Sequence, residues 1–185
     1  MKIIKDIYNK GNFKDYFKRN KVFLIISLLL VLLSVSTAYY NPGSYGNISQ
    51  AIHMSMAIKN TSITSIFSTN LVYMLYTIVM GFSFSVMAVV NVIIGCVDIV
   101  VLYSNGSIDS FLISNQAYTL LLLLSNVFAL TAAFLVTKLE IRLITALIKN
   151  RGQVLKKIKV PFKDVILTFT FIVALLFISS LITLI

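Results

Sequence analysis

The sequence predicts an all-α integral membrane protein, a single helical bundle over residues 22–185 with about five membrane segments, an N-terminus in the cytoplasm and a C-terminus outside. Three observations support this fold class. First, 58% of the residues are apolar and the mean hydropathy is +0.94, whereas a soluble domain is about 45–50% apolar. Second, the apolar residues gather in runs long enough to cross a bilayer. Third, nearly all Lys and Arg flank these runs in two patches, which is typical of a cytoplasmic membrane face.

Residues 1–21 are predicted to form a cytoplasmic basic amphipathic segment. They hold seven of the sixteen Lys and Arg of the chain. Apolar residues recur between these cations at helical spacing, which suits a segment that lies on the membrane surface. Gly11 is expected to divide the segment into two short pieces. The segment is interpreted either as a simple interfacial anchor or as a docking arm for a partner.

The first span is predicted at 22–40. Its length of about 19 residues exceeds the usual 7–15 residue core of a signal peptide, so we expect an uncleaved anchor. Tyr39 and Tyr40 at its end suit the headgroup level of a membrane. Asn41-Pro42-Gly43 then ends the helix, and a polar loop is expected over 41–70.

The stretch 71–103 decides the topology. It has 33 residues and one charge, Asp98. A single helix of this length would be roughly 50 Å long, against a bilayer core of about 30 Å. If the stretch crosses once, seven Lys and Arg lie on one side and nine on the other. If it turns and returns, fifteen share a side and only Lys59 lies opposite. The positive-inside tendency favours the return.

Two short spans are therefore predicted at 71–87 and 89–103, with the turn near Met87 to Asn91. Each span would reach only about 24 Å. They would need local thinning of the bilayer, or would be partly re-entrant.

Two longer spans follow at 117–137 and 164–185. The helix of the first is expected to continue from Lys138 as a charged extension, in which Glu140 pairs only loosely with Lys138 or Arg142. Strongly basic residues follow. Pro161 lies where a new helix can start, so the last span is expected just after it.

Asp98, Asn91 and Asn126 form the candidate intramembrane polar site. A carboxylate within a membrane segment is energetically expensive and usually faces a bundle interior or water. Asp98 is consistent with an ion or proton site, or with a polar contact to a partner helix. It is also consistent with a group near the outer interface that is protonated or bonded to Asn91 or Asn126, and this second interpretation is the one we favour. Gly95 lies four residues after Asn91, and small and polar residues at that spacing allow close helix packing.

Three asparagines are candidate glycan acceptors. The pattern Asn-x-Ser/Thr occurs at Asn47, Asn60 and Asn105, and all three lie on the predicted outside.

No enzyme template fits the sequence. There is no carboxylate pair in a plausible site, no His beside a nucleophile, no phosphate loop and no metal-ligand spacing. The one histidine, His53, is interpreted as a surface residue, and Cys96 as a core packing residue. Because the cations belong to the membrane flanks, no nucleic-acid partner is expected. The sequence predicts a non-enzymatic protein with no cofactor and no metal.

From Ser65 onward, several features follow in a set order. A Phe and an Asn lead into a span, a Gly lies within the apolar helix, an Asn is followed shortly by a Gly, and a later span carries an apolar frame. These residues are Phe67, Asn70, Gly81, Asn91, Gly95 and the string Ser125-Asn126-Val127-Phe128-Ala129-Leu130-Thr131-Ala132. The order resembles the stage II sporulation protein M family of multi-pass membrane proteins. In the family's string, His, Gly, Glu and Pro stand where this chain has Ser125, Asn126, Ala129 and Thr131.

The resemblance implies five segments and a non-enzymatic membrane component, which in sporulating bacteria belongs to a complex with cell-wall hydrolases. We therefore expect a multi-pass scaffold or adaptor in the cell membrane. Its expected partners are the lipid bilayer, other membrane or envelope proteins and further copies of itself. The alternative is a permease-like subunit of a transporter, with Asp98, Asn91 and Asn126 lining a path and a cytoplasmic ATPase docking on 138–163.

Overall fold

The computed structural model describes residues 7–40, 63–104, 116–149 and 154–182, and the regular structure in these ranges is helical. Four stretches are long and apolar enough to cross a membrane, and a fifth, Val86–Val97, is apolar but shorter. The predicted class, a membrane protein built from α-helices, agrees with this architecture. The helices are α2 (Lys10–Tyr40), α4 (Ile63–Val79), the short 3₁₀ helix η1 (Met80–Ser83), α5 (Val86–Ser104), α7 (Gln116–Lys149) and α8 (Val154–Ile182).

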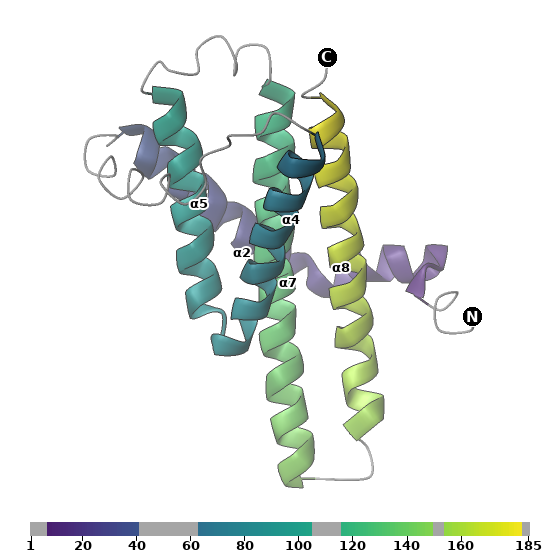
Figure 1. Ribbon diagram of the computed structural model, residues 1–185. Coiled ribbons are helices and arrows are strands. Elements are labelled where there is room, and N and C mark those ends of the chain that lie inside the picture. Colours follow the sequence, from purple (N-terminus) through teal and green to yellow (C-terminus); the bar gives the residue numbers. More distant parts are fainter. Residues whose placement is uncertain (1–6, 41–62, 105–115, 150–153, 183–185) are drawn as a thin grey trace.

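Helix α7 is the centre of the bundle. Helices α4, α5 and α8 run alongside it, and α2 passes obliquely behind them (Figure 1). Of the most apolar stretch of α7, 56% is buried, against 17% for the stretch that contains α4. Three separate hydrophobic clusters each include residues of α7. The other helices therefore pack around α7 and leave their outer faces to the surroundings.

Small residues let the neighbours approach α7 closely. Ala129, Ala132 and Ala133 are fully buried. Gly81 of η1 lies directly against this surface, because a Cβ added to it would be 2.6 Å from the carbonyl oxygen of Ala133. Backbone contact at this distance leaves no room for any side chain, so Gly81 fixes where η1 meets α7.

The stretch 71–103 does reverse direction, but not where the sequence predicted. Phe84 and Ser85 adopt left-handed φ values of 52° and 61°, and α5 begins at Val86. The prediction of a turn near Met87 to Asn91 is therefore wrong. The position of the turn depends on tertiary contacts with α7. The Thr137 hydroxyl donates to the carbonyl oxygen of Gly81 over 2.6 Å and also pairs with the Ser85 hydroxyl.

Helix α4 is displaced toward the N-terminus relative to the predicted span 71–87. It begins at Ile63, within the stretch expected to be loop, because Phe67 and Leu71 at helical spacing pack against a buried cluster. The helical stretch Ile63–Ser83 has 21 residues. At about 1.5 Å per residue it is long enough for the apolar core of a bilayer without local thinning.

Helix α2 runs without a break from Lys10 to Tyr40. The prediction that Gly11 divides the basic segment is wrong, because the non-helical residues are Tyr8 and Asn9 and Gly11 lies in the first turn of α2. The Tyr8 hydroxyl is 2.8 Å from the Thr170 hydroxyl, and this contact joins the segment before α2 to α8.

The helical extension beyond Lys138 is confirmed, since α7 continues to Lys149. Helix α8 starts at Val154, so Pro161 lies inside the helix rather than at its start. Proline removes one backbone donor from a helix. We attribute the helical continuation to packing, because Pro161 is buried and α8 lies along α7 over its length.

Candidate functional site

Helices α4 and α5 are joined by a small polar network. The Tyr73 hydroxyl of α4 donates to the carbonyl oxygen of Asn91 on α5 over 2.6 Å. The Asn91 side chain returns a bond of 2.8 Å from Nδ2 to the Thr77 hydroxyl. The Tyr73 ring lies directly against Gly95, where any Cβ would overlap its hydroxyl. Gly95, the small residue four positions after Asn91, therefore leaves the space that the Tyr73 ring occupies.

Asn126 of α7 is buried, with a relative exposure of 1%. Its Nδ2 donates to the carbonyl oxygen of Leu122 over 3.3 Å, whereas its Oδ1 has no hydrogen-bond partner. A carbonyl oxygen only accepts, so the atom that faces Leu122 must be the nitrogen. The unpartnered atom is therefore an acceptor.

A groove with a volume of about 770 Å³ lies between α4, α5 and α7, and we call it the asparagine groove. Val72 and Tyr76 on its edge are 65% and 56% exposed, so the groove opens sideways on the bundle surface. None of the described residues that line it is charged. They are Ser68, Thr69, Asn70, Val72, Tyr73, Met74, Tyr76, Asn91, Ile94, Gly95, Ile99, Leu122 and Asn126.

The structure brings together two of the three residues of the predicted polar site. Asn91 and Asn126 both line the asparagine groove. Asp98 lies on α5, seven positions after Asn91, and its side chain is outside the described residues. The predicted acceptors Asn47, Asn60 and Asn105 and the histidine His53 also lie outside them.

The sequence did not indicate that Asn70, Tyr73 and Tyr118 form hydrogen bonds between helices in this region. Nδ2 of Asn70 donates to the Tyr118 hydroxyl over 3.1 Å, which joins α4 to α7. Tyr73 supplies the contact to Asn91. Asn70 was singled out only through the family pattern, and tyrosines at membrane helix ends are usually attributed to the headgroup level.

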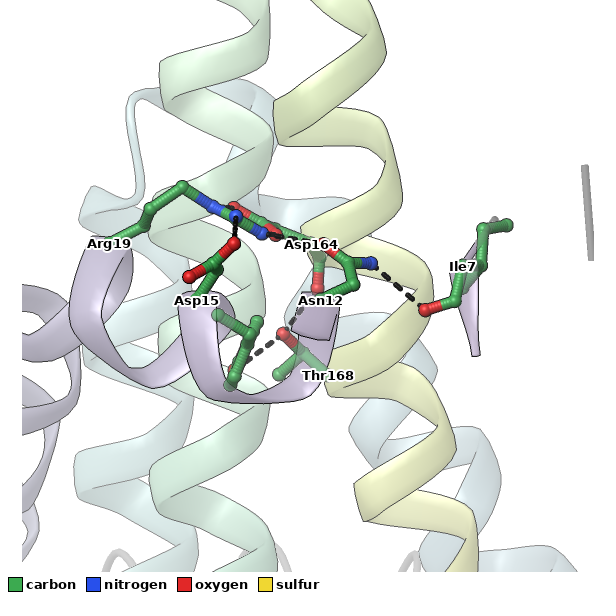
Figure 2. Close-up of polar contacts among 7 residues, drawn as sticks. Ile7, Asn12, Asp15, Arg19, Asp164 and Thr168 are labelled. Carbon is green, nitrogen blue, oxygen red and sulfur yellow. Dashed lines mark hydrogen bonds and ion pairs between the residues drawn. The ribbon is translucent and has the colours of Figure 1, made fainter. Parts of the chain in front are cut away.

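A second polar cluster lies where α2 crosses α8. The Arg19 guanidinium contacts both carboxylate oxygens of Asp164, at 2.6 Å from Nη2 and 3.3 Å from Nε (Figure 2). Nearby, the hydroxyls of Tyr16 and Thr168 are 2.8 Å apart. Asn12 accepts a further bond of 3.0 Å from Arg19. The cluster fastens the basic end of α2 to the start of the last membrane helix.

Beyond this crossing, α7 and α8 continue as a two-helix projection (Figure 1). We call the described residues 138–148 and 158–163 the basic hairpin. Nζ of Lys138 lies 5.2 Å from the centre of the Phe23 ring, a cation–π distance that ties its base to α2. Glu140 has one carboxylate oxygen that is buried without a hydrogen-bond partner. The exposed apolar side chains of the basic hairpin are Ile141, Ile144, Leu147, Ile148, Val160 and Phe162.

Cys96 is fully buried in a cluster with residues of α2 and α7, so its predicted packing role is confirmed. Among the described residues, no three His, Cys, Asp or Glu side chains gather in a way that would hold a metal ion.

Comparison with protein-family models, with curated proteins and with solved structures finds no match for this chain. The resemblance to the stage II sporulation protein M family therefore stays a prediction.

Proposed function

We propose that this chain is a multi-pass scaffold or adaptor of the cell membrane, which assembles membrane or envelope partners without catalysing a reaction. The observation that carries the proposal is the basic hairpin, whose exposed apolar residues nothing in the described chain covers. This role is also the one that the resemblance to the stage II sporulation protein M family implies.

The proposal includes five membrane segments with the basic hairpin in the cytoplasm. The turn between α4 and α5 is bonded through Ser85 to Thr137, which directly precedes Lys138 at the base of the hairpin. Both α4 and α5 therefore reach the same level of the bundle as the basic residues. This supports the five-segment arrangement, in which fifteen of the sixteen Lys and Arg share the side that the positive-inside tendency assigns to the cytoplasm.

The basic hairpin has the composition of a protein-binding surface. Ile141, Ile144 and Ile148 repeat at helical spacing and are 50%, 43% and 77% exposed. Cations accompany this stripe on both helices, among them Lys159 and Lys163. An amphipathic helix with acidic flanks complements both features, because its apolar face covers the isoleucines and its carboxylates lie near the cations.

Affinity purification from native membranes in mild detergent, with mass spectrometry of the captured proteins, tests this role. The unmodified chain is compared with the double variant Ile144→Ser/Ile148→Ser. The matched control is Tyr39→Ser/Tyr40→Ser, which removes two exposed apolar side chains at the opposite end of the bundle. Partners that are lost with the first variant and kept with the second support the proposal. An identical set of proteins from all three chains contradicts it.

A second candidate function is a permease-like subunit of a transporter. It is favoured by one observation, namely that Asn91 and Asn126 line the same groove. In this role the basic hairpin docks a cytoplasmic ATPase. A nucleotide-binding protein among the partners lost with Ile144→Ser/Ile148→Ser would favour this candidate, and an envelope-acting protein would favour the scaffold.

A further inference from the structure

The asparagine groove is built from apolar stretches of α4, α5 and α7. Asn126 is in the middle of the apolar part of α7, and Tyr73 and Asn91 lie in apolar helices beside it. Hydrocarbon chains of lipids cannot donate a hydrogen bond, and water is scarce in the core of a bilayer. A polar atom left alone there is costly.

Asn126 Oδ1 is such an atom. It is an acceptor, it is buried, and no donor among the described residues reaches it. Met74 lines the same groove and is also buried. Its unbranched side chain has three rotatable bonds, so it can shift to admit a donor toward Oδ1. The groove therefore has apolar walls and one acceptor atom, Asn126 Oδ1, that lacks a hydrogen-bond donor.

The shape, volume and lining of the groove limit the kind of ligand that could supply the missing donor. Helices α4 and α5 diverge from their common turn (Figure 1), and the groove opens between them past Val72 and Tyr76. Its volume of about 770 Å³ is within the usual range of small-molecule sites, about 300–1,000 Å³. Among the described residues, no charged side chain lines the groove, so none of them would neutralise a phosphate or an ammonium group.

From this geometry we infer that the asparagine groove binds a neutral lipid with a free hydroxyl group, which donates its hydrogen bond to Asn126 Oδ1. The hydroxyl lies at the floor of the groove on α7. The hydrocarbon chain leaves between α4 and α5 into the bilayer. This inference does not depend on the scaffold role, since it concerns a different surface of the bundle.

The chain contains no tryptophan, so a single Tyr76→Trp substitution reports on the groove alone. The purified chain in phosphatidylcholine nanodiscs is titrated with a diacylglycerol whose acyl chains carry bromine, a quencher of tryptophan fluorescence. A second titration uses the same lipid with its hydroxyl methylated, which removes the donor. Val79→Trp is the matched control, since Val79 is exposed on the same helix and does not line the groove.

We expect saturable quenching of the Tyr76→Trp reporter, with half-saturation at a mole fraction about five- to tenfold lower for the hydroxyl lipid than for its methyl ether, as one hydrogen bond implies. The Val79→Trp reporter should show gradual quenching that is equal for both lipids. Adding Asn126→Leu should abolish the difference between the lipids.

Equal quenching by the two lipids would overturn the hydroxyl contact, and equal behaviour of the two reporters would overturn the site itself. The comparison of lipids is made in the chain with Asn126 intact, so it remains decisive even where Asn126→Leu fails to fold. Val72→Trp serves as a second reporter in the same groove.

Discussion

Arg19 of α2 and Asp164 of α8, separated by 145 positions in sequence, form a two-point ion pair that fastens the first membrane helix to the last. The carboxylate is almost fully buried, with 2% of its side chain exposed, whereas the guanidinium is 31% exposed. A buried carboxylate requires a partner, and the planar guanidinium of Arg suits it better than the ammonium of Lys. The pair thus sets the position of α2 on the bundle.

Replacing Arg19 should destabilise the bundle, because it leaves the Asp164 carboxylate buried without its partner. We expect Arg19→Met to lower the free energy of unfolding by about 2 kcal/mol, less than a fully buried pair would lose because Arg19 is partly exposed. Lys18→Met, which removes a neighbouring exposed cation, should change it by less than about 0.5 kcal/mol. SDS titration in mixed micelles measures both, and equal effects of the two variants would contradict the role of the pair.

Much of this architecture follows from the sequence, because apolar runs and cation patches are local signals. They indicated an all-helical membrane protein, the reversal within 71–103 and the continuation of α7 beyond Lys138. The contact between Arg19 and Asp164 could not be predicted, because the residues around each of them give no signal for a partner 145 positions away in sequence. The contact of Arg19 with Asp15, four positions earlier on the same helix, is longer, at 3.9 Å.

The candidate site was predicted in part for the same reason. Asn91 and Asn126 were singled out as polar residues in apolar runs, and the structure places both in one groove. Tyr73 was missed because tyrosine is common at membrane helix ends. The turn was placed too late, since its position depends on the bonds of Thr137 to Gly81 and Ser85 and not on local turn residues.

Adding a methyl group at Gly81 should be strongly destabilising. Its Cβ would be 2.6 Å from a backbone oxygen of α7, which cannot move aside as a flexible side chain can. We expect Gly81→Ala to cost about 2–3 kcal/mol, as overpacking does. Gly11→Ala is the matched control, since a Cβ at Gly11 meets nothing within 4 Å, and it should be neutral or stabilising by up to about 1 kcal/mol. Equal unfolding midpoints of the two variants would argue against close packing of η1 on α7.

Removing the Thr137 hydroxyl should loosen the turn between α4 and α5. Thr137→Val keeps the shape of the side chain but leaves Gly81 and Ser85 without their bonds to α7. We expect a loss of about 1–2 kcal/mol. Thr145→Val is the control, because the Thr145 hydroxyl is exposed and bonds within its own helix over 2.7 Å. Hydrogen exchange of α5 should rise for the first variant only, and unchanged exchange would refute the attachment.

Single cysteines should report the proposed topology. In a Cys96→Ala background, an impermeant maleimide should label Tyr40→Cys in intact cells, because the end of α2 is expected outside. Phe84→Cys and Leu147→Cys should react only after the membrane is opened. All three side chains lie on the bundle surface, with exposures of 79%, 61% and 54%. Labelling of Phe84→Cys in intact cells would contradict the five-segment arrangement, because Phe84 lies at the turn between α4 and α5.

Among the described residues, Asn20 is a further buried polar group without a hydrogen-bond partner. It is fully buried on α2, and neither the nitrogen nor the oxygen of its carboxamide has a hydrogen-bond partner. Leaving one buried polar group unsatisfied costs about 1–3 kcal/mol, and an apolar side chain of similar size has no such cost. Asn20→Leu should therefore raise the free energy of unfolding by about 1–2 kcal/mol, since leucine fits imperfectly.

The matched comparison for Asn20→Leu is Asn12→Leu in SDS titration. Asn12 donates to the carbonyl oxygen of Ile7 over 2.9 Å and accepts from Arg19 over 3.0 Å, so the same substitution there removes two formed bonds. We expect it to destabilise by about 1 kcal/mol. Opposite signs for the two asparagines would show that Asn20 is a cost to folding. A loss of stability at Asn20 would instead mean that a donor or acceptor outside the described residues, or a bound water, satisfies it.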